Sequence, residues 1–297
     1  MNTEADPTPH GGLAPNGARK PAGGSLADLG IRVASAIVMV ALALGAVWTG
    51  GFVFAAFWTV AGIAIFWEWQ HLVGGEAFAN RVYVGGAGVA LVAGLASLGH
   101  PEAAVSITAI AALAVAWLAG RDSAIWAGAG VIYACAMVIA VCVLRASLFY
   151  GLVATLWLFA VVWTTDVMAY FGGRLIGGPK LWPRVSPGKT WSGFLVGVGF
   201  GAAAGCVLAL WLTTPGEASI LPLILLGLMT AAISQGGDLF ESSIKRRFGA
   251  KDSGRLIPGH GGIMDRLDAF VFASIFAAII GTLHKGSLAA AHGLLVW

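Results

Sequence analysis

Apolar runs of roughly 20 residues recur along the chain from Gly30 almost to its end, and they limit the possible folds more than any other feature. A run of this length crosses the hydrocarbon core of a bilayer as a helix, which satisfies all of its own backbone hydrogen bonds. The runs do not alternate apolar and polar residues, as the strands of a transmembrane β-barrel do. Only 10% of the residues are charged, against about a quarter in soluble domains. We therefore predict an all-α polytopic integral membrane protein.

Nine transmembrane spans account for these runs, and we expect them to form a single transmembrane domain over 28–297. Residues 1–27 are rich in Gly, Pro, Ala and Asn and show no hydrophobic periodicity, so a disordered cytoplasmic tail is expected there. The first span is expected to be an uncleaved helix rather than a signal peptide. The spans are predicted at about 30–48, 52–71, 82–98, 103–119, 125–144, 151–172, 192–212, 220–241 and 267–284.

The distribution of Lys and Arg indicates how these spans are oriented. With the N-terminus in the cytoplasm, 15 of the 17 Lys and Arg residues fall on the cytoplasmic side, and only Arg145 and Lys285 fall outside. Such an excess is typical of the short cytoplasmic loops of membrane proteins. We therefore expect a multi-pass protein of the cell (inner) membrane, with its N-terminus and its active site in the cytoplasm. No run of Lys and Arg is interleaved with aromatic residues, so no nucleic-acid partner is expected.

One dense polar segment, residues 236–268, interrupts the apolar chain. It holds six of the 17 Lys and Arg residues and five of the 14 Asp and Glu residues. In its first part, spacings of i, i+3, i+4 and i+7 place four polar residues on one helix face, namely Asp238, Glu241, Ser242 and Lys245. In its last part, Asp265 and Asp268 share a helix face at i, i+3. The glycine-rich link between the two parts, residues 249–262, carries Lys251, Asp252, Arg255 and His260.

Carboxylates from two helix ends with cations around them suit a Mg²⁺–triphosphate substrate. Mg²⁺ prefers one or two carboxylates with phosphate oxygens and water, and we predict that Asp238 and Asp265 hold it. The alternative is a solvated loop whose charges only fix the topology, which accounts for Lys and Arg but not for these two aspartates. The sequence leaves His260 open as a general base or a loop residue bonded to a backbone carbonyl. It also leaves open whether Glu68 and His71 face this cavity or reach the membrane interface.

A second polar segment covers residues 164–192. Asp166 lies at membrane depth, where an ionisable residue is costly, so it is a candidate functional residue or a structural partner of a nearby cation. The loop after it is rich in Gly and Pro and is expected to bind phosphate through Arg174, Lys180, Arg184 and Lys189. Its PGKT sequence is not a P-loop, because Pro183 replaces the required glycine and no strand is expected before it.

Glycines form a stripe along the seventh expected span. They recur every four residues and therefore lie on one side of a helix: Gly193, Gly197, Gly201 and Gly205. The neighbouring GFGAAA sequence lacks the preceding strand and the following acidic residue of a dinucleotide-binding fingerprint. The stripe therefore predicts close packing against another helix.

Both polar segments resemble a known enzyme family. Residues 242–268, SSIKRRFGAKDSGRLIPGHGGIMDRLD, resemble the signature of the phosphatidate cytidylyltransferase (CDP-diacylglycerol synthase) family without a gap. DVMAYFGGR from Asp166 and SPGKTW from Ser186 resemble a second region of that family. The resemblance covers the C-terminal half of the chain, about 150–285, which is expected to be the catalytic part. It departs from the family at Gly188, where a lysine is more usual.

The resemblance implies an enzyme that condenses CTP with phosphatidic acid to CDP-diacylglycerol and pyrophosphate, with its catalytic site at the cytoplasmic face of the C-terminal helices. It implies that Asp238 and Asp265 bind Mg²⁺ and that K⁺ shares their site. Membrane lipid and a second copy of the chain, forming a homodimer, are the other implied partners. The remaining residues assigned to the site are Lys245, Arg246, Lys251, Asp252 and His260 for catalysis, and Asp166, Ser186, Lys189, Thr190, Ser242, Arg266 and Asp268 for substrate binding.

Three other kinds of protein share parts of this pattern. A transporter is also polytopic, but its polar residues usually fall in two related halves, whereas here they gather in the C-terminal half. A CDP-alcohol phosphatidyltransferase needs an upstream D-x-x-D-G, which is absent, and its second aspartate pair is spaced differently from Asp265 and Asp268. A lipid or polyprenol kinase that uses CTP is the nearest alternative, and the group it transfers distinguishes it.

Overall fold

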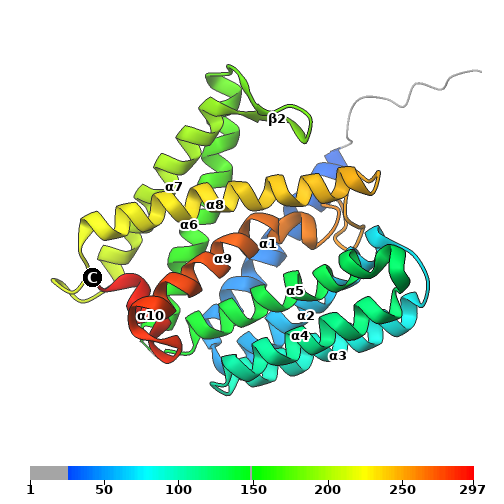
Figure 1. Ribbon diagram of the computed structural model, residues 1–297. Coiled ribbons are helices and arrows are strands. Elements are labelled where there is room, and N and C mark those ends of the chain that lie inside the picture. Colours follow the sequence, from blue (N-terminus) through cyan, green and yellow to red (C-terminus); the bar gives the residue numbers. More distant parts are fainter. Residues whose placement is uncertain (1–25, 148) are drawn as a thin grey trace, which may run out of the picture.

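The computed structural model describes residues 26–147 and 149–297, and helices dominate it (Figure 1). Within these residues nine helices are long and apolar enough to cross a membrane, which confirms the predicted polytopic all-α fold. They are α1 (Leu26–Thr49), α2 (Gly51–Val73), α3 (Phe78–Ser97), α4 (Pro101–Leu118), α5 (Gly120–Arg145), α6 (Tyr150–Leu175), α7 (Trp191–Leu212), α8 (Ile220–Arg247) and α9 (Met264–Lys285). The tail predicted over 1–27 lies outside the described residues except for its last two, which begin α1.

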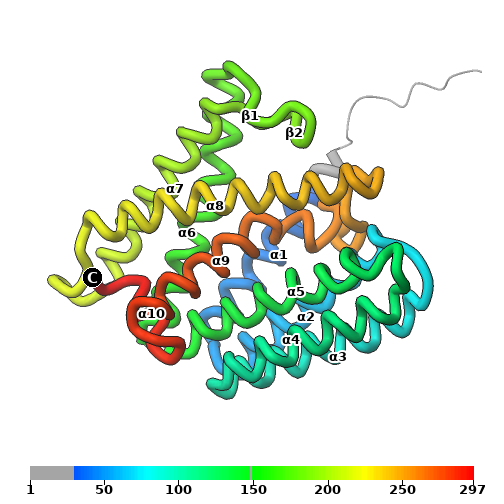
Figure 2. Tube along the Cα trace, viewed as in Figure 1, coloured from blue at the N-terminus to red at the C-terminus, as the bar shows by residue number. Residues whose placement is uncertain are grey.

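The helices fall into two groups joined through α8 and α9. Helices α2, α3, α4 and α5 pack as one bundle, while α6 and α7 form a long hairpin that points away from it (Figures 1 and 2). Helix α9 contacts α8 on one side and α5 on the other, so it lies between the two groups. The polar segment 236–268 spans the end of α8 and the start of α9, and the fold therefore places it where the groups meet.

Helix α5 is the centre of the bundle. Its apolar residues lie on all sides of the helix, and 78% of the residues in its apolar 18-residue stretch are buried inside the protein. This is typical of a helix with neighbours on every side. The ring of Trp69 on α2 packs directly against Gly130 of α5, and Trp58, Trp69 and Trp157 are almost completely buried. The ring of Trp58 on α2 stacks on Phe270 of α9 with 4.8 Å between centroids. The core therefore ties α2 directly to α9.

The predicted glycine stripe packs α7 against α6. A Cβ atom on Gly193, Gly197 or Gly201 would lie within 3 Å of a backbone oxygen of α6, at 2.6, 2.7 and 2.9 Å respectively. A Cβ on Gly205 would lie 2.8 Å from Nε1 of Trp157, also on α6. Only glycine lets two helix backbones approach this closely. The prediction of close helix packing is confirmed.

The Gly- and Pro-rich loop before α7 contains a short β-hairpin that the sequence did not predict. Strand β1 (Lys180–Trp182) pairs antiparallel with β2 (Ser186–Thr190), and the turn between them contains Pro183. The expectation that no strand precedes PGKT is therefore wrong, because a turn at Pro183 brings the two flanks together. PGKT itself lies in β2, so it does not form the strand–loop–helix of a P-loop.

The hairpin leads directly into α7. Thr190 is the N-cap residue of this helix, and its Oγ1 accepts the amide hydrogen of Gly193 at 3.1 Å. The end of β2 is thereby held against the start of α7. After α9, a 3₁₀ turn (Ser287–Ala289) and a short helix, α10 (Ala290–Leu295), fold back against the end of α9.

Candidate active site

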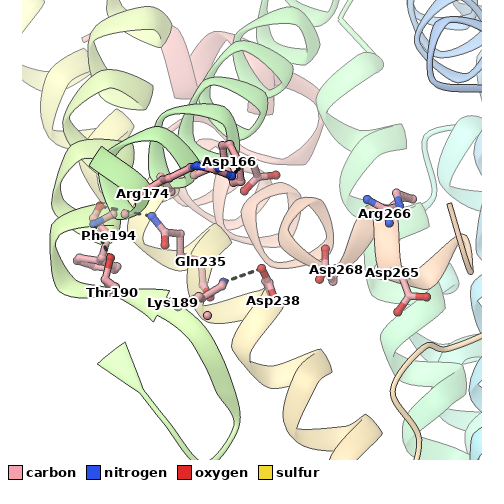
Figure 3. A pocket seen from close by; sticks show the side chains of 15 residues that line it. Asp166, Arg174, Lys189, Thr190, Phe194, Gln235, Asp238, Asp265, Arg266 and Asp268 are labelled. Carbon is pink, nitrogen blue, oxygen red and sulfur yellow. Dashed lines mark hydrogen bonds and ion pairs between the residues drawn. The ribbon is translucent and has the colours of Figure 1, made fainter. Parts of the chain in front are cut away.

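A pocket opens where the hairpin, α6, α7, α8 and α9 meet (Figure 3). Its volume is about 740 Å³. Four carboxylates and three cations line it, namely Asp166, Asp238, Asp265 and Asp268 with Arg174, Lys189 and Arg266. The two polar segments lie far apart in the chain, and the fold brings them to this one cavity. The pocket therefore contains eight of the residues predicted to bind substrate, metal or phosphate: the four aspartates, Arg174, Lys189, Thr190 and Arg266.

Asp238 joins α8 to the hairpin. Its Oδ2 lies 2.6 Å from Nζ of Lys189, and the two side chains are 32% and 21% exposed. The ammonium group of Lys189 also donates to the carbonyl oxygen of Gln235 at 3.4 Å. Ser242, one helical turn after Asp238, donates to its Oδ1 at 3.3 Å, as the predicted helix face requires. Lys189 and Asp238 thus bring opposite charges together inside the pocket.

Asp265 lies in the first turn of α9 and is bound on several sides. Its Oδ1 accepts from Nζ of Lys245 at 2.6 Å, and its Oδ2 accepts the amide hydrogens of Ser253 and Gly262 at 3.0 and 2.9 Å. A carboxylate is favourable at this place because the first turn of a helix presents unpaired amide hydrogens and a partial positive charge. Asp265 therefore organises the glycine-rich link as well as lining the pocket.

Lys245 connects two acidic residues beneath the pocket. Its Nζ lies 2.6 Å from Asp265 and 2.6 Å from Oε2 of Glu241, whose side chain is completely buried. A buried lysine between two carboxylates offsets their repulsion and fixes both of them. Lys245 itself does not line the pocket, but it contacts the pocket residue Asp265 directly.

Asp166 and Asp268 line the pocket without a paired cation. Among the described residues neither has a Lys, Arg or His nitrogen within 4 Å, and Asp268 accepts only the amide hydrogen of the next residue, Ala269, at 2.8 Å. Asp268 and Asp238 line the same pocket and carry like charges. The described side chains nonetheless form no ready-made cluster of three or more metal ligands. The carboxylates of Asp166 and Asp268 instead keep oxygen lone pairs free to bind a cation.

The other residues predicted to bind substrate or phosphate, or to act in catalysis, lie outside the pocket, namely Lys180, Arg184, Ser186, Ser242, Lys245, Arg246, Lys251, Asp252 and His260. Lys251 and Asp252 are exposed on the glycine-rich link, and Arg246 donates to the carbonyl oxygen of Ala250. His260 lies against α1, where its Nδ1 is 2.8 Å from Oγ of Ser35. Its backbone oxygen accepts two hydrogen bonds from Arg266. The ring of His260 therefore bonds to a hydroxyl, not to the backbone carbonyl of the loop-residue interpretation, and its use as a general base stays a prediction.

Glu68 on α2 is the residue whose role the sequence did not reveal. It does not line the pocket, and its side chain does not extend outward from the helix end, because it is completely buried beneath the start of α9. Its carboxylate accepts hydrogen bonds from Ser253, Ile263 and Met264, all of which belong to the polar segment. A Glu near the end of an apolar span was the only signal of this role. His71 is exposed; its ring bonds to the carbonyl oxygen of Trp67 on the same helix and packs edge-on against Phe78 of α3.

Comparisons with known proteins agree with this site. Residues 30–284 match the cytidylyltransferase family. Phosphatidate cytidylyltransferases of Brucella abortus (strain 2308) and Brucella melitensis are each 38% identical over 263 residues, which cover 87% of this chain and 95% of the relative. A phosphatidate cytidylyltransferase of Staphylococcus haemolyticus is 46% identical over 122 residues, or 41% of this chain and 46% of that protein. The family match includes every residue that lines the pocket, and this chain belongs to the cytidylyltransferase family.

Proposed function

We propose that this protein transfers the cytidylyl group of CTP to phosphatidic acid, giving CDP-diacylglycerol and pyrophosphate for phospholipid biosynthesis. The observation that carries the proposal is the pocket in which four aspartates meet Lys189 and Arg266 at one end of the helices. The relatives that cover most of the chain are named phosphatidate cytidylyltransferases, and the pocket supplies the charges that this reaction needs.

The proposed reaction is an in-line displacement at phosphorus. A phosphate oxygen of phosphatidic acid attacks the α-phosphorus of CTP, the bond from that phosphorus to the bridging oxygen breaks, and pyrophosphate leaves. A phosphate monoester dianion is already nucleophilic near neutral pH, so the step requires no dedicated base. The position of His260 outside the pocket is consistent with this chemistry.

We assign the phosphate contacts of the reaction to the basic residues of the pocket. Lys189 and Arg266 are placed to neutralise the triphosphate and the departing pyrophosphate. Lys189 is paired with Asp238 at 2.6 Å, and a bound phosphate offers its ammonium group a second anionic partner. Thr190 and Arg174 lie on the same side of the pocket as Lys189 and are available for further phosphate contacts.

A divalent cation fits this pocket. The unpaired carboxylates of Asp166 and Asp268 leave an excess of negative charge and oxygen ligands of the kind that Mg²⁺ prefers. We propose that Asp238 and Asp265 hold Mg²⁺, with Asp268 beside them and K⁺ as a second ion of the same site. When bound, Mg²⁺ would neutralise charge on the triphosphate.

The location of the site explains how two different substrates reach it. The charge asymmetry of the loops supports a protein of the cell (inner) membrane with its N-terminus and the pocket on the cytoplasmic side. CTP then enters from the cytosol and phosphatidic acid from the bilayer. The pocket residues run from Asp166 to Asp268, so we assign the chemistry to the C-terminal half, about 150–285. The family resemblance also supports a homodimer, which light scattering of the purified protein tests.

An assay of the purified protein tests the proposed reaction. Protein in detergent with CTP, phosphatidic acid and Mg²⁺ should form CDP-diacylglycerol and pyrophosphate in equal amounts, and a chelator should stop both. A CTP-dependent lipid or polyprenol kinase would form CDP and a phosphorylated lipid without pyrophosphate. A transporter would form no product. Either of those outcomes, with well-folded protein, contradicts the proposal.

A further inference from the structure

Glu68 binds the polar segment from a distant part of the chain. Its Oε1 accepts the amide hydrogen of Ile263 at 3.0 Å, and its Oε2 accepts from Oγ of Ser253 at 3.0 Å and from the amide of Met264 at 2.8 Å. The side chain is fully buried, and no cation within 4 Å pairs with it among the described residues. Neutral donors of the link and of the start of α9 therefore stabilise its charge.

The backbone of the link lies directly against this carboxylate at two glycines. A Cβ atom on Gly254 would lie 2.5 Å from Oε1 of Glu68, and one on Gly262 would lie 2.6 Å from Oε2. Real side chains do not approach this closely, so the link passes over Glu68 only because these positions are glycine. The close approach makes the two glycines part of the same contact as the three hydrogen bonds.

The groups that bind Glu68 lie next to the groups that bind Asp265. Ser253 donates its hydroxyl to Glu68 and its amide hydrogen to Asp265. Gly262 donates its amide to Asp265, and the next two amides, of Ile263 and Met264, donate to Glu68. The link is thus held between two carboxylates, one from α2 and one from α9. Movement of the link away from Glu68 would also displace the donors of Asp265.

We infer that Glu68 is a positioning residue for the proposed cytidylyl transfer, because it fixes the start of α9 and with it the pocket residues Asp265, Arg266 and Asp268. This inference rests on the proposed function. It gives the N-terminal bundle a role in the site, since α2 reaches the link although none of its residues lines the pocket. Glu68 acts through the link and touches no substrate in this assignment.

Substitution of Glu68 by glutamine is the most direct test. Whichever way the amide is turned, its NH₂ group opposes an N–H or O–H donor of the link, while the volume of the side chain is kept. Turnover should fall on the order of 10- to 100-fold, because a shift of about 1 Å in catalytic groups costs that much. Glu68→Asp keeps the charge with a shorter reach and should recover part of the loss. Glu102→Gln, at an exposed acid in the first turn of α4, is the matched control and should keep wild-type turnover.

Limited trypsin digestion gives a second measurement, independent of activity. Lys251 and Arg255 are exposed on the link, so cleavage after them should become several-fold faster in Glu68→Gln. Cleavage after Arg184, exposed in the turn of the hairpin, should stay unchanged and serves as the internal reference. General unfolding would speed up cleavage at both places.

The inference is overturned if Glu68→Gln keeps wild-type turnover, or if it loses turnover while cleavage of the link stays at the wild-type rate. If Glu68→Gln does not fold, Ser253→Ala serves as the second test of the inference, because it removes one of the three donors to Glu68. This variant should show a smaller loss of turnover and faster cleavage of the link than the wild-type protein. An unchanged Ser253→Ala variant would then reject the inference. Should the wild-type protein form no CDP-diacylglycerol, the proposed function fails, and the cleavage rates still decide whether Glu68 holds the link.

Discussion

At the scale of single residues, the two aspartates predicted to bind metal lie in different environments. Asp238 has one ion pair and is 32% exposed, whereas Asp265 is 8% exposed and binds a lysine and two backbone amides. Helical spacing identified both as members of a polar face, because that spacing depends only on nearby residues. The hydrogen bonds of Asp265 depend on how the link folds back, and no local pattern predicts that.

This difference predicts different results for the two Asn variants. Asp238→Asn and Asp265→Asn should each lower turnover by on the order of 100-fold or more, because each removes a charge from the site. Asp265→Asn should in addition speed up tryptic cleavage of the link, since an amide cannot accept from all three donors. Asp122→Asn, at an exposed aspartate at the start of α5, should keep normal turnover and cleavage. Near-normal turnover in both site variants would reject the metal assignment.

Two lysines of the hairpin allow a matched test of phosphate binding. Lys189 lines the pocket beside Asp238, whereas Lys180 is exposed on β1 and does not line it. Lys189→Met should raise the KM for CTP and lower kcat/KM by about 10-fold or more, because a charge-assisted contact to phosphate is lost. Lys180→Met removes the same charge from the same hairpin and should leave both parameters unchanged. Equal effects of the two substitutions would show that only the general charge of the hairpin matters.

At the scale of elements, the helices were more predictable than the connections between them. The long apolar runs predict all nine spans within the described residues, since length and hydropathy are enough to define a transmembrane helix. The hairpin was missed because its strands, Lys180–Trp182 and Ser186–Thr190, are short and contain or adjoin Pro and Gly, which normally disfavour strands. At the base of the hairpin, the amide of Trp191 at the start of α7 donates to the carbonyl oxygen of Pro179 at 3.0 Å, a contact that strand propensity does not predict.

The glycine stripe of α7 gives a prediction for helix packing. In Gly201→Ala, the new methyl group would lie 2.9 Å from the carbonyl oxygen of Val161 on α6, so α6 and α7 must separate. We expect a loss of about 1–3 kcal/mol in stability and a lower melting temperature in detergent. Gly199→Ala lies on the same helix with no atom within 4 Å of its Cβ position, and its melting temperature should not change. Equal melting temperatures for the two variants would show that the stripe does not determine the packing.

At the scale of the whole molecule, the contact between α2 and the polar segment could not be predicted from the sequence. Glu68 is separated from its three partners by 185, 195 and 196 residues, and no spacing rule relates positions so far apart. The resemblance to the family covered the C-terminal half, so it assigned no role to α2. The pocket, in contrast, was largely predictable, because eight of its lining residues were identified as functional candidates from local motifs and spacings.

The orientation of the molecule in the membrane is also a property of the whole chain, and cysteine labelling tests the predicted orientation. The native cysteines, Cys135, Cys142 and Cys206, are buried, so they should react slowly and give a low background. Lys251→Cys on the link and Pro215→Cys between α7 and α8 place exposed thiols at opposite ends of α8. A membrane-impermeant maleimide added to intact cells should label position 215 alone, and opening the cells should expose position 251. Labelling of position 251 from outside would reverse the orientation and leave the pocket out of reach of cytosolic CTP.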